Sequence, residues 1–237
     1  FQATMSVVDE PGAAPRSVVI QPNHPLDVDG ARAFLVGNGY APSVTVTDGN
    51  GQVAYRGPVV TKPQDGNYKS LFVVKAPNAE PRQIALFGVF LPTYQLQDGI
   101  PASIFPQPLE PRLMVNVALA EPGVDGLGYT NGRPQSIMRL DASKMTVAKA
   151  ADGQPLRVLL APGATATLPD GAGTVRFDGL TRYAALDIRY DPSKGWALAT
   201  ALLALAGVTA SLFVRRRRVW VRVVREDDGG GPSARTL

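Results

Sequence analysis

The feature that most constrains this chain is an uncharged run close to its end. Residues 195–214 read GWALATALLALAGVTASLFV and contain no Asp, Glu, Lys, Arg or His. As a helix rising about 1.5 Å per residue, they would span ~30 Å, the thickness of the hydrocarbon core of a bilayer. A core helix of a soluble protein is rarely apolar on every face over this length. The run therefore predicts a transmembrane helix over 195–214.

Small polar residues and flanking aromatic residues agree with this prediction. Thr200, Thr209 and Ser211 can return their hydroxyl groups to the helix backbone. Trp196 lies at one end of the run, and Trp220 lies just beyond the other end. Tryptophan is enriched at membrane interfaces, so we expect these two residues to mark the two surfaces of the bilayer.

A cluster of arginines predicts the orientation of the helix. Arg215, Arg216, Arg217 and Arg218 follow the run directly, whereas the flank before it balances its basic residues with two aspartates. Basic residues beside a membrane helix accumulate on the cytoplasmic side. We therefore expect 215–237 to be a cytoplasmic basic tail with a disordered end, and 1–194 to lie outside. The segment VWVRVV (219–224) is expected either to extend the helix or to lie along the headgroups.

The charge distribution argues against a nucleic-acid partner. The net charge of +4 arises from 24 basic and 20 acidic residues, of which seven arginines and three acids lie in 215–237. The remaining 214 residues carry 17 basic and 17 acidic residues and are neutral. A neutral outer part does not offer the basic surface that polyanions require. The expected partner of the uncharged run 195–214 is the lipid bilayer.

Residues 1–194 show short apolar runs separated by Gly, Pro, Asn and Asp, a pattern typical of β-strands and turns. The clearest hairpin is SVTVT (43–47), DGNG and QVAYRG (52–57), because its turn residues tolerate positive φ. The runs are 17–21, 31–36, 43–47, 52–57, 71–76, 84–91, 113–120, 135–140, 145–149, 156–161, 174–180 and 181–192. They predict an antiparallel β-sandwich or open barrel, with short helical turns near 98–105 or 141–145 and a subdivision near 106–111 as further options.

Few residues of the outer part suggest catalysis. The chain has no cysteine, which excludes disulfides, Cys-ligated zinc and redox pairs, and its only histidine is His24, between two prolines. No G-x-S-x-G motif supplies a serine nucleophile. The glycine-rich loop 123–132 lacks the lysine of a phosphate-binding loop, and DGNG (48–51) lacks most of a calcium loop. We expect no catalytic and no metal site, and a domain that binds or scaffolds.

Three stretches stand in a fixed order along the chain. They are VVIQPNHPLDVDGARAFLVGNGYAPSVTVTDGNGQVAYRGP (18–58), LPDGAGTVRFDGLTRYAALDIRYDPSKGWAL (168–198) and SLFVRRRRVWVRV (211–223). In this order they resemble the ResB family of cytochrome c biogenesis proteins. The features that carry the resemblance are an Asn-x-Pro-Leu turn and a Gly-Tyr pair before a hairpin, a strand that enters the last membrane helix, and an Arg-Arg-x-Trp-Val motif where the chain leaves that helix. The stretches 62–79 and 131–141 are similar to the actinobacterial branch of that family.

The resemblance implies a function. ResB proteins are partners of a ResC/CcsA-type membrane protein, with which they deliver haem across the membrane and attach it to apocytochrome c. The resemblance covers the family's outer domain and last helix, so we expect further transmembrane segments before Phe1. The family's haem-associated histidine belongs to such an earlier segment, and His24 does not match it. This portion is therefore expected to bind no cofactor, while the complex handles haem.

Two other functions remain open from the residues alone. One is a membrane-anchored extracellular binding, adhesion or sensor module without enzymatic activity. The other is an anchored hydrolase, which needs a pair of carboxylates in a cleft. The hypothesis that we carry forward is a non-catalytic, membrane-anchored assembly factor for c-type cytochromes.

Overall fold

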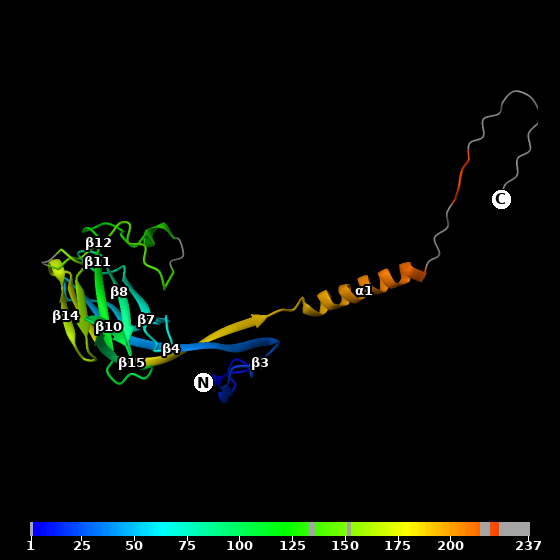
Figure 1. The fold of residues 1–237 in the computed structure, drawn as a ribbon, viewed down its shortest axis with the longest axis horizontal. Helices are drawn as coiled ribbons and strands as arrows, with labels where there is room; N and C mark the ends of the chain where they lie inside the picture. Colours follow the sequence, from blue (N-terminus) through cyan, green and yellow to red (C-terminus); the bar gives the residue numbers. More distant parts are fainter. Residues whose placement is uncertain (1, 133–135, 151–152, 214–218, 223–237) are drawn as a thin grey trace, which may run out of the picture. The chain divides into compact units, whose positions relative to one another are not determined.

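The structure is a computed structural model that describes residues 2–132, 136–150, 153–213 and 219–222. It divides into two units, Phe1–Arg189 and Tyr190–Leu237. The described strands begin in the first unit, and the described α-helix lies in the second. Figure 1 shows both units in the colours of the sequence.

One sheet of the first unit is built on two unusually long strands, β4 (Ala31–Asp48) and β15 (Gly173–Tyr190). They are neighbours in the order β14-β15-β4-β3, and β5 also pairs with β4. Thr45 hydrogen-bonds to Asp178, and Gly39 lies against Tyr183, so β4 and β15 run antiparallel. The shorter strands are β3 (Leu26–Val28), β5 (Val53–Pro58) and β14 (Thr165–Leu168).

The other sheet has β8 (Ile84–Leu91) and β11 (Arg112–Leu119) at its centre. All its pairings are antiparallel. Gly88 of β8 pairs with Val115 of β11. A Cβ atom at Gly88 would overlap the backbone carbonyl of Met114, so this close approach of the strands requires glycine. The remaining strands are β6 (Lys62–Pro63), β7 (Ser70–Ala76), β12 (Thr146–Val147) and β13 (Arg157–Leu160).

The two sheets enclose one apolar core, and the fold is a β-sandwich (Figure 1). On β7, alternate residues are buried, among them Phe72, Val74 and Ala76. Phe90 of β8 meets Phe177 of β15 edge to face, with ring centroids 6.5 Å apart. Burying one such large apolar side chain stabilises a fold by about 1.5–3 kcal/mol. Other fully buried members are Val44, Val46, Ile84, Leu86, Leu113, Val115, Val117 and Val175.

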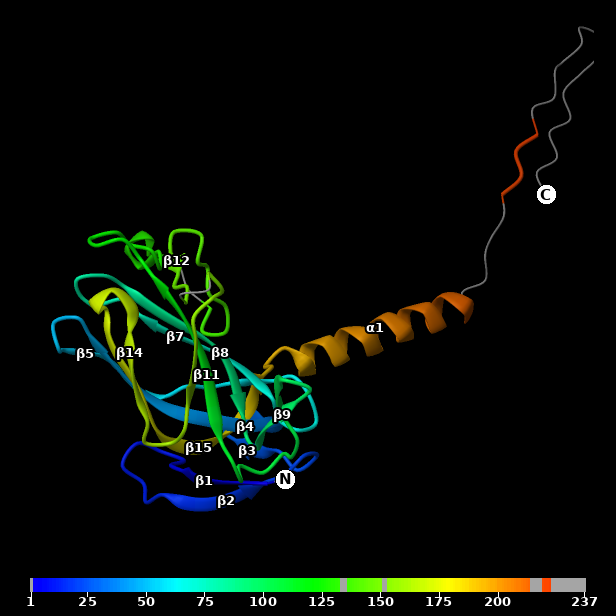
Figure 2. The same ribbon diagram turned by 60° about the vertical axis from the view of Figure 1, so that its left-hand side comes forward.

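Two hairpins lie outside the sandwich sheets. β1 (Ala3–Val7) pairs with β2 (Arg16–Ile20), and β9 (Tyr94–Gln97) pairs with β10 (Ile100–Ser103). The β1–β2 hairpin has its own small core, in which Ile20 packs with Leu26, Leu35 and Leu186. It therefore sits against β3 and against parts of β4 and β15, as Figure 2 shows.

The second unit contains the helix α1 (Lys194–Phe213). Among the described residues it is the one helix that is long and apolar enough to cross a membrane. The hydroxyl of Thr200 donates to the carbonyl of Trp196 at 3.0 Å, and that of Thr209 donates to the carbonyl of Leu205 at 2.8 Å. Within the uncharged run, these polar groups are thus satisfied inside the helix. The described residues 219–222 are not helical, so the predicted extension of the helix is not found there.

The predicted fold class is confirmed, since the chain is mainly antiparallel β-structure followed by one apolar helix. Several details differ. The runs 31–36 and 43–47 belong to one strand, β4, and the runs 174–180 and 181–192 fall largely in another, β15. Residues 98–105 contain the turn and the second strand of the β9–β10 hairpin in place of a helical turn, and the described residues 136–140 form no strand.

Candidate functional site

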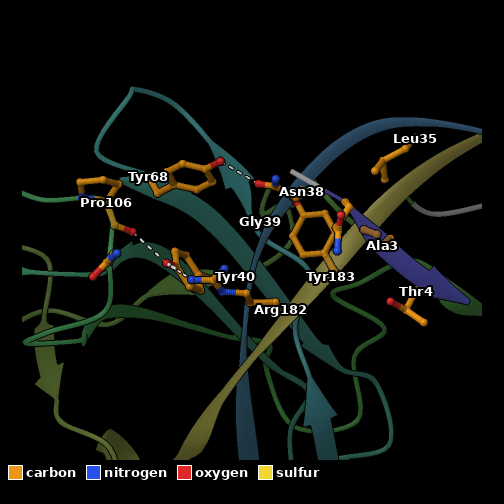
Figure 3. A pocket seen from close by; sticks show the side chains of 13 residues that line it. Ala3, Thr4, Leu35, Asn38, Gly39, Tyr40, Tyr68, Pro106, Arg182 and Tyr183 are labelled. Carbon is orange, nitrogen blue, oxygen red and sulfur yellow. Dashed lines mark hydrogen bonds between the residues drawn. The ribbon is translucent and has the colours of Figure 1, made fainter. Parts of the chain in front are cut away.

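One hollow in the first unit is a cavity of about 510 Å³ between β1, β4 and β15 (Figure 3). Its volume lies in the range typical of sites for small ligands. The lining combines aromatic rings, amides and one charged side chain. The lining residues are Gln2, Ala3, Thr4, Leu35, Asn38, Gly39, Tyr40, Tyr68, Pro106, Gln107, Arg182, Tyr183 and Ala184.

Tyr40, on β4, connects the cavity to the core. Its side chain is buried, and its ring lies 5.7 Å from the ring of Phe90 and 5.7 Å from that of Tyr68. Its hydroxyl donates to the carbonyl of Pro106 at 2.9 Å, which ties the 104–109 loop to β4. A buried tyrosine needs a partner for its hydroxyl, and this bond supplies one. The position of Tyr40 is therefore fixed from two sides.

Arg182, on β15, places a positive charge over Tyr40. Its guanidinium carbon lies 5.2 Å from the centre of the Tyr40 ring, and its Nη2 donates to the Tyr40 hydroxyl at 3.2 Å. Cation–π contact of this kind fixes a guanidinium without neutralising it.

Arg182 differs in its charge environment from other arginines of its own strand. Arg176 pairs with Asp178 at 3.5 Å, and Arg189 pairs with Asp187 at 2.7 Å. No acidic residue lines the cavity, and Arg182 has no ion-pair partner among the described residues. The cavity therefore carries one uncompensated positive charge.

Two further tyrosines, Tyr68 and Tyr183, line the cavity. The Tyr183 hydroxyl donates to the carbonyl of Thr61 at 2.6 Å, and the Tyr68 hydroxyl donates to Oδ1 of Asn38 at 2.7 Å. Burial raises the pKa of Tyr183 above its ordinary value of 10.0, and the neighbouring Tyr68 raises it further. Tyr183 thus stays protonated at neutral pH and acts through its ring and hydroxyl, not as a phenolate.

The chemistry of this lining favours binding over catalysis. Within the described part of the chain, this lining includes no serine, cysteine, histidine or carboxylate, and Thr4 contributes its one aliphatic hydroxyl. Among the described residues, no group of three or more Asp, Glu or His side chains is placed to hold a metal ion. A guanidinium, three phenols and three side-chain amides offer hydrogen bonds and stacking to a ligand.

The residues that the sequence singled out lie elsewhere. His24 is exposed in the turn between β2 and β3, where its N–H and carbonyl both bond to Gln21. Trp196 is exposed in the first turn of α1, and Trp220 is exposed in the described segment 219–222. Arg215, Arg216, Arg217 and Arg218 lie outside the described residues.

The glycine-rich loop 123–132 is organised by Asp125. Its carboxylate accepts bonds from the hydroxyl and the backbone N–H of Thr130, at 2.5 and 2.8 Å, and from the backbone N–H of Gly128 at 2.9 Å. The hydrogen bonds from Thr130 hold the pKa of Asp125 well below its ordinary value. This aspartate therefore shapes the loop through protein contacts.

Sequence reasoning missed the cavity residues Tyr40, Tyr68, Arg182 and Tyr183. Tyr40 and Arg182 are separated by 142 positions and meet because β4 and β15 are neighbours. The available signal was their place in the quoted stretches, with Gly39-Tyr40 in 18–58 and Arg182-Tyr183 in 168–198.

Three comparisons with known proteins place this structure in context. The family model described as the ResB-like family matches residues 1–234. No curated protein matches the chain, and no solved structure matches it either. The matched range includes both the β-sandwich and the helix α1.

Proposed function

Because the chain belongs to the ResB-like family, we propose that it is a membrane-anchored assembly factor for c-type cytochromes. It acts with a ResC/CcsA-type membrane protein in delivering haem and attaching it covalently to apocytochrome c. Haem is cargo of this complex, and the portion described here holds no cofactor of its own. The observation that carries the proposal is the family match, which extends over the outer domain and the helix together.

In this proposal the β-sandwich lies outside the cytoplasmic membrane, and α1 anchors it. The arginines Arg215, Arg216, Arg217 and Arg218 set the orientation by remaining on the cytoplasmic side. Trp196 and Trp220 lie at the two interfaces. A domain outside the membrane suits a step that takes place on an exported apocytochrome.

The described lining of the cavity, which lacks serine, cysteine, histidine and carboxylate side chains, supports a non-catalytic role for this portion. A scaffold contributes to haem attachment by holding reactants near one another, which lowers the entropic cost of their encounter. The outer domain is therefore proposed to dock a partner protein or the apocytochrome, and the chemistry of attachment belongs elsewhere in the complex.

The test is a haem stain of c-type cytochromes in cells depleted of this protein and complemented with its gene. We expect loss of covalently bound haem while apocytochrome, followed by immunoblot, is still exported. Complementation should restore the stain. Normal holocytochrome levels after complete depletion would contradict the proposed function.

A further inference from the structure

We propose that the cavity beside Tyr40 binds an extended peptide segment that carries a carboxylate side chain, with Arg182 as its anchor. The inference goes beyond the proposed function and stands on the cavity alone, so that either can fail while the other holds. It rests on three features of the described residues: the charge of the lining, the fixed guanidinium, and the free edge of β1.

The first feature is charge complementarity. Among the described residues, Arg182 is the only charged one that lines the cavity. A guanidinium has five N–H donors, and the bond to the Tyr40 hydroxyl uses one of them. The other donors have no protein partner among the described residues. A carboxylate is the group that a guanidinium fork binds best, through two parallel charge-assisted hydrogen bonds.

The second feature is that the guanidinium is held in place before a ligand arrives. Tyr40 is buried, its ring supports the guanidinium, and its hydroxyl is itself held by the carbonyl of Pro106. An arginine that is already ordered loses less conformational entropy on binding than a mobile one. The aromatic walls, Tyr68 and Tyr183, offer stacking surfaces to an apolar side chain next to the carboxylate.

The third feature indicates that the ligand is a peptide. β1 pairs with β2 along one edge, and no strand in the described part of the chain pairs with its other edge. Gln2, Ala3 and Thr4, at the start of this hairpin, line the cavity (Figure 3). The free edge of a strand offers backbone N–H and carbonyl groups to an extended chain, a common mode of peptide recognition.

The experiment selects displayed random peptides on the full chain reconstituted in nanodiscs of phosphatidylcholine, after removal of peptides that bind empty nanodiscs. We expect enrichment of peptides with Asp or Glu next to an apolar or aromatic residue. The selected peptide is then synthesised in two forms, one with its acidic residue and one with the matching amide. The amide form should bind about tenfold more weakly, as expected for losing a hydrogen bond to a charged group.

Variants locate the binding. Arg182→Gln should lower the affinity for the acidic peptide by about tenfold and leave the affinity for the amide peptide unchanged. Arg182→Lys, which keeps the charge and loses the fork, should fall between Arg182→Gln and the unchanged protein. Arg176→Gln is the matched control, because Arg176 lies on the same strand and is already paired with Asp178. Its affinity for the peptide should equal that of the unchanged protein.

Three outcomes would overturn the inference. The first is that no peptide is enriched over empty nanodiscs. The second is that the enriched peptides lack acidic residues. The third is that the acidic peptide binds Arg182→Gln as well as it binds the unchanged protein, which would place the binding outside the cavity. Because Arg182 is exposed, the unfolding temperature of Arg182→Gln should match that of the unchanged protein.

Discussion

Gly39 of β4 lies directly against the ring of Tyr183 of β15: a Cβ atom on Gly39 would be 2.5 Å from Cε1 of that ring. The tyrosine ring covers the place where any other residue would project a side chain. Its hydroxyl then reaches the carbonyl of Thr61. Glycine at 39 thus sets the position of one wall of the cavity.

Gly39→Ala should therefore displace the end of the Tyr183 ring, break its bond to Thr61 and destabilise the first unit by about 0.5–1.5 kcal/mol, the net contribution of one hydrogen bond. The measurement is thermal unfolding followed by far-UV circular dichroism of the full chain in detergent. Gly37→Ala is the control, because a Cβ there would lie 3.6 Å from Cβ of Ala185, an ordinary contact. Equal unfolding temperatures for the two variants would contradict the close packing described here.

Asp48 should make the free energy of unfolding of the first unit decrease at acidic pH. Burial by itself raises the pKa of this carboxyl, but the backbone N–H groups of Gln52, Glu80 and Asn50 outweigh it, so the pKa lies below 3.8. A lowered pKa means that the ionised form stabilises the fold, fully above 3.8 and progressively less as the pH falls below it. Asp48→Asn should cost about 1–3 kcal/mol at neutral pH, and this difference should shrink in acid. Denaturant unfolding at several pH values measures it.

Asp65 provides a matched control for Asp48. Its carboxylate also accepts bonds from the backbone N–H groups two and four positions later, both at 3.0 Å, but it is exposed and reaches no distant strand. Asp65→Asn should therefore have a smaller effect than Asp48→Asn at neutral pH. A larger effect at Asp65 would show that burial and the bond to Glu80 contribute little.

Replacing Arg215, Arg216, Arg217 and Arg218 with glutamine should disturb the orientation of α1, because the remaining flank charges no longer favour one side strongly. Protease protection of a tag after Leu237, in membrane vesicles, measures the fraction of chains with a cytoplasmic tail. Arg16→Gln with Arg32→Gln is the control that removes charge from the outer part. An unchanged orientation of the tail variant would refute the positive-inside explanation.

His24→Ala should leave cytochrome c maturation nearly intact, because His24 is exposed in a turn and lies outside the cavity lining. A haem stain of cells carrying the variant, normalised to the level of the protein, measures this. Loss of maturation at a normal protein level would assign a role to the histidine that its position does not suggest.

The sequence predicted local structure best where turns and alternation agree. The hairpin 43–57 is found, with Val46 opposite Tyr55 in the β4–β5 ladder. It failed where a glycine serves a distant contact. The run 31–36 was predicted to end before Gly37 and Gly39, but β4 continues through both glycines. Gly39 leaves room for the ring of Tyr183, which packs against it. The run 135–140 was also wrong as a strand in its described part, where Ile137 is 70% exposed.

The cavity could not be predicted from the sequence, because it too depends on contacts between residues far apart in the chain. Its key contact joins Tyr40 to Arg182, and only the pairing of β4 with β15 brings them together. Arg182 gives no local hint, since Arg176 and Arg189 on the same strand form ion pairs with aspartates two positions away. That Arg182 has no ion-pair partner among the described residues becomes visible only when the positions of the neighbouring strands are known.

The uninterrupted length of β15 limits how a water-soluble form of the outer domain can be made. The strand ends at Tyr190, and α1 begins at Lys194, so an end point within residues 191–193 leaves both elements whole. A cut even a few residues earlier shortens the strand that carries Arg182 and Tyr183, and with it the neighbour of β4. Truncations that step back from the membrane in larger intervals therefore remove a growing part of β15, and Leu186, which packs against the β1–β2 hairpin, is among the first core residues lost.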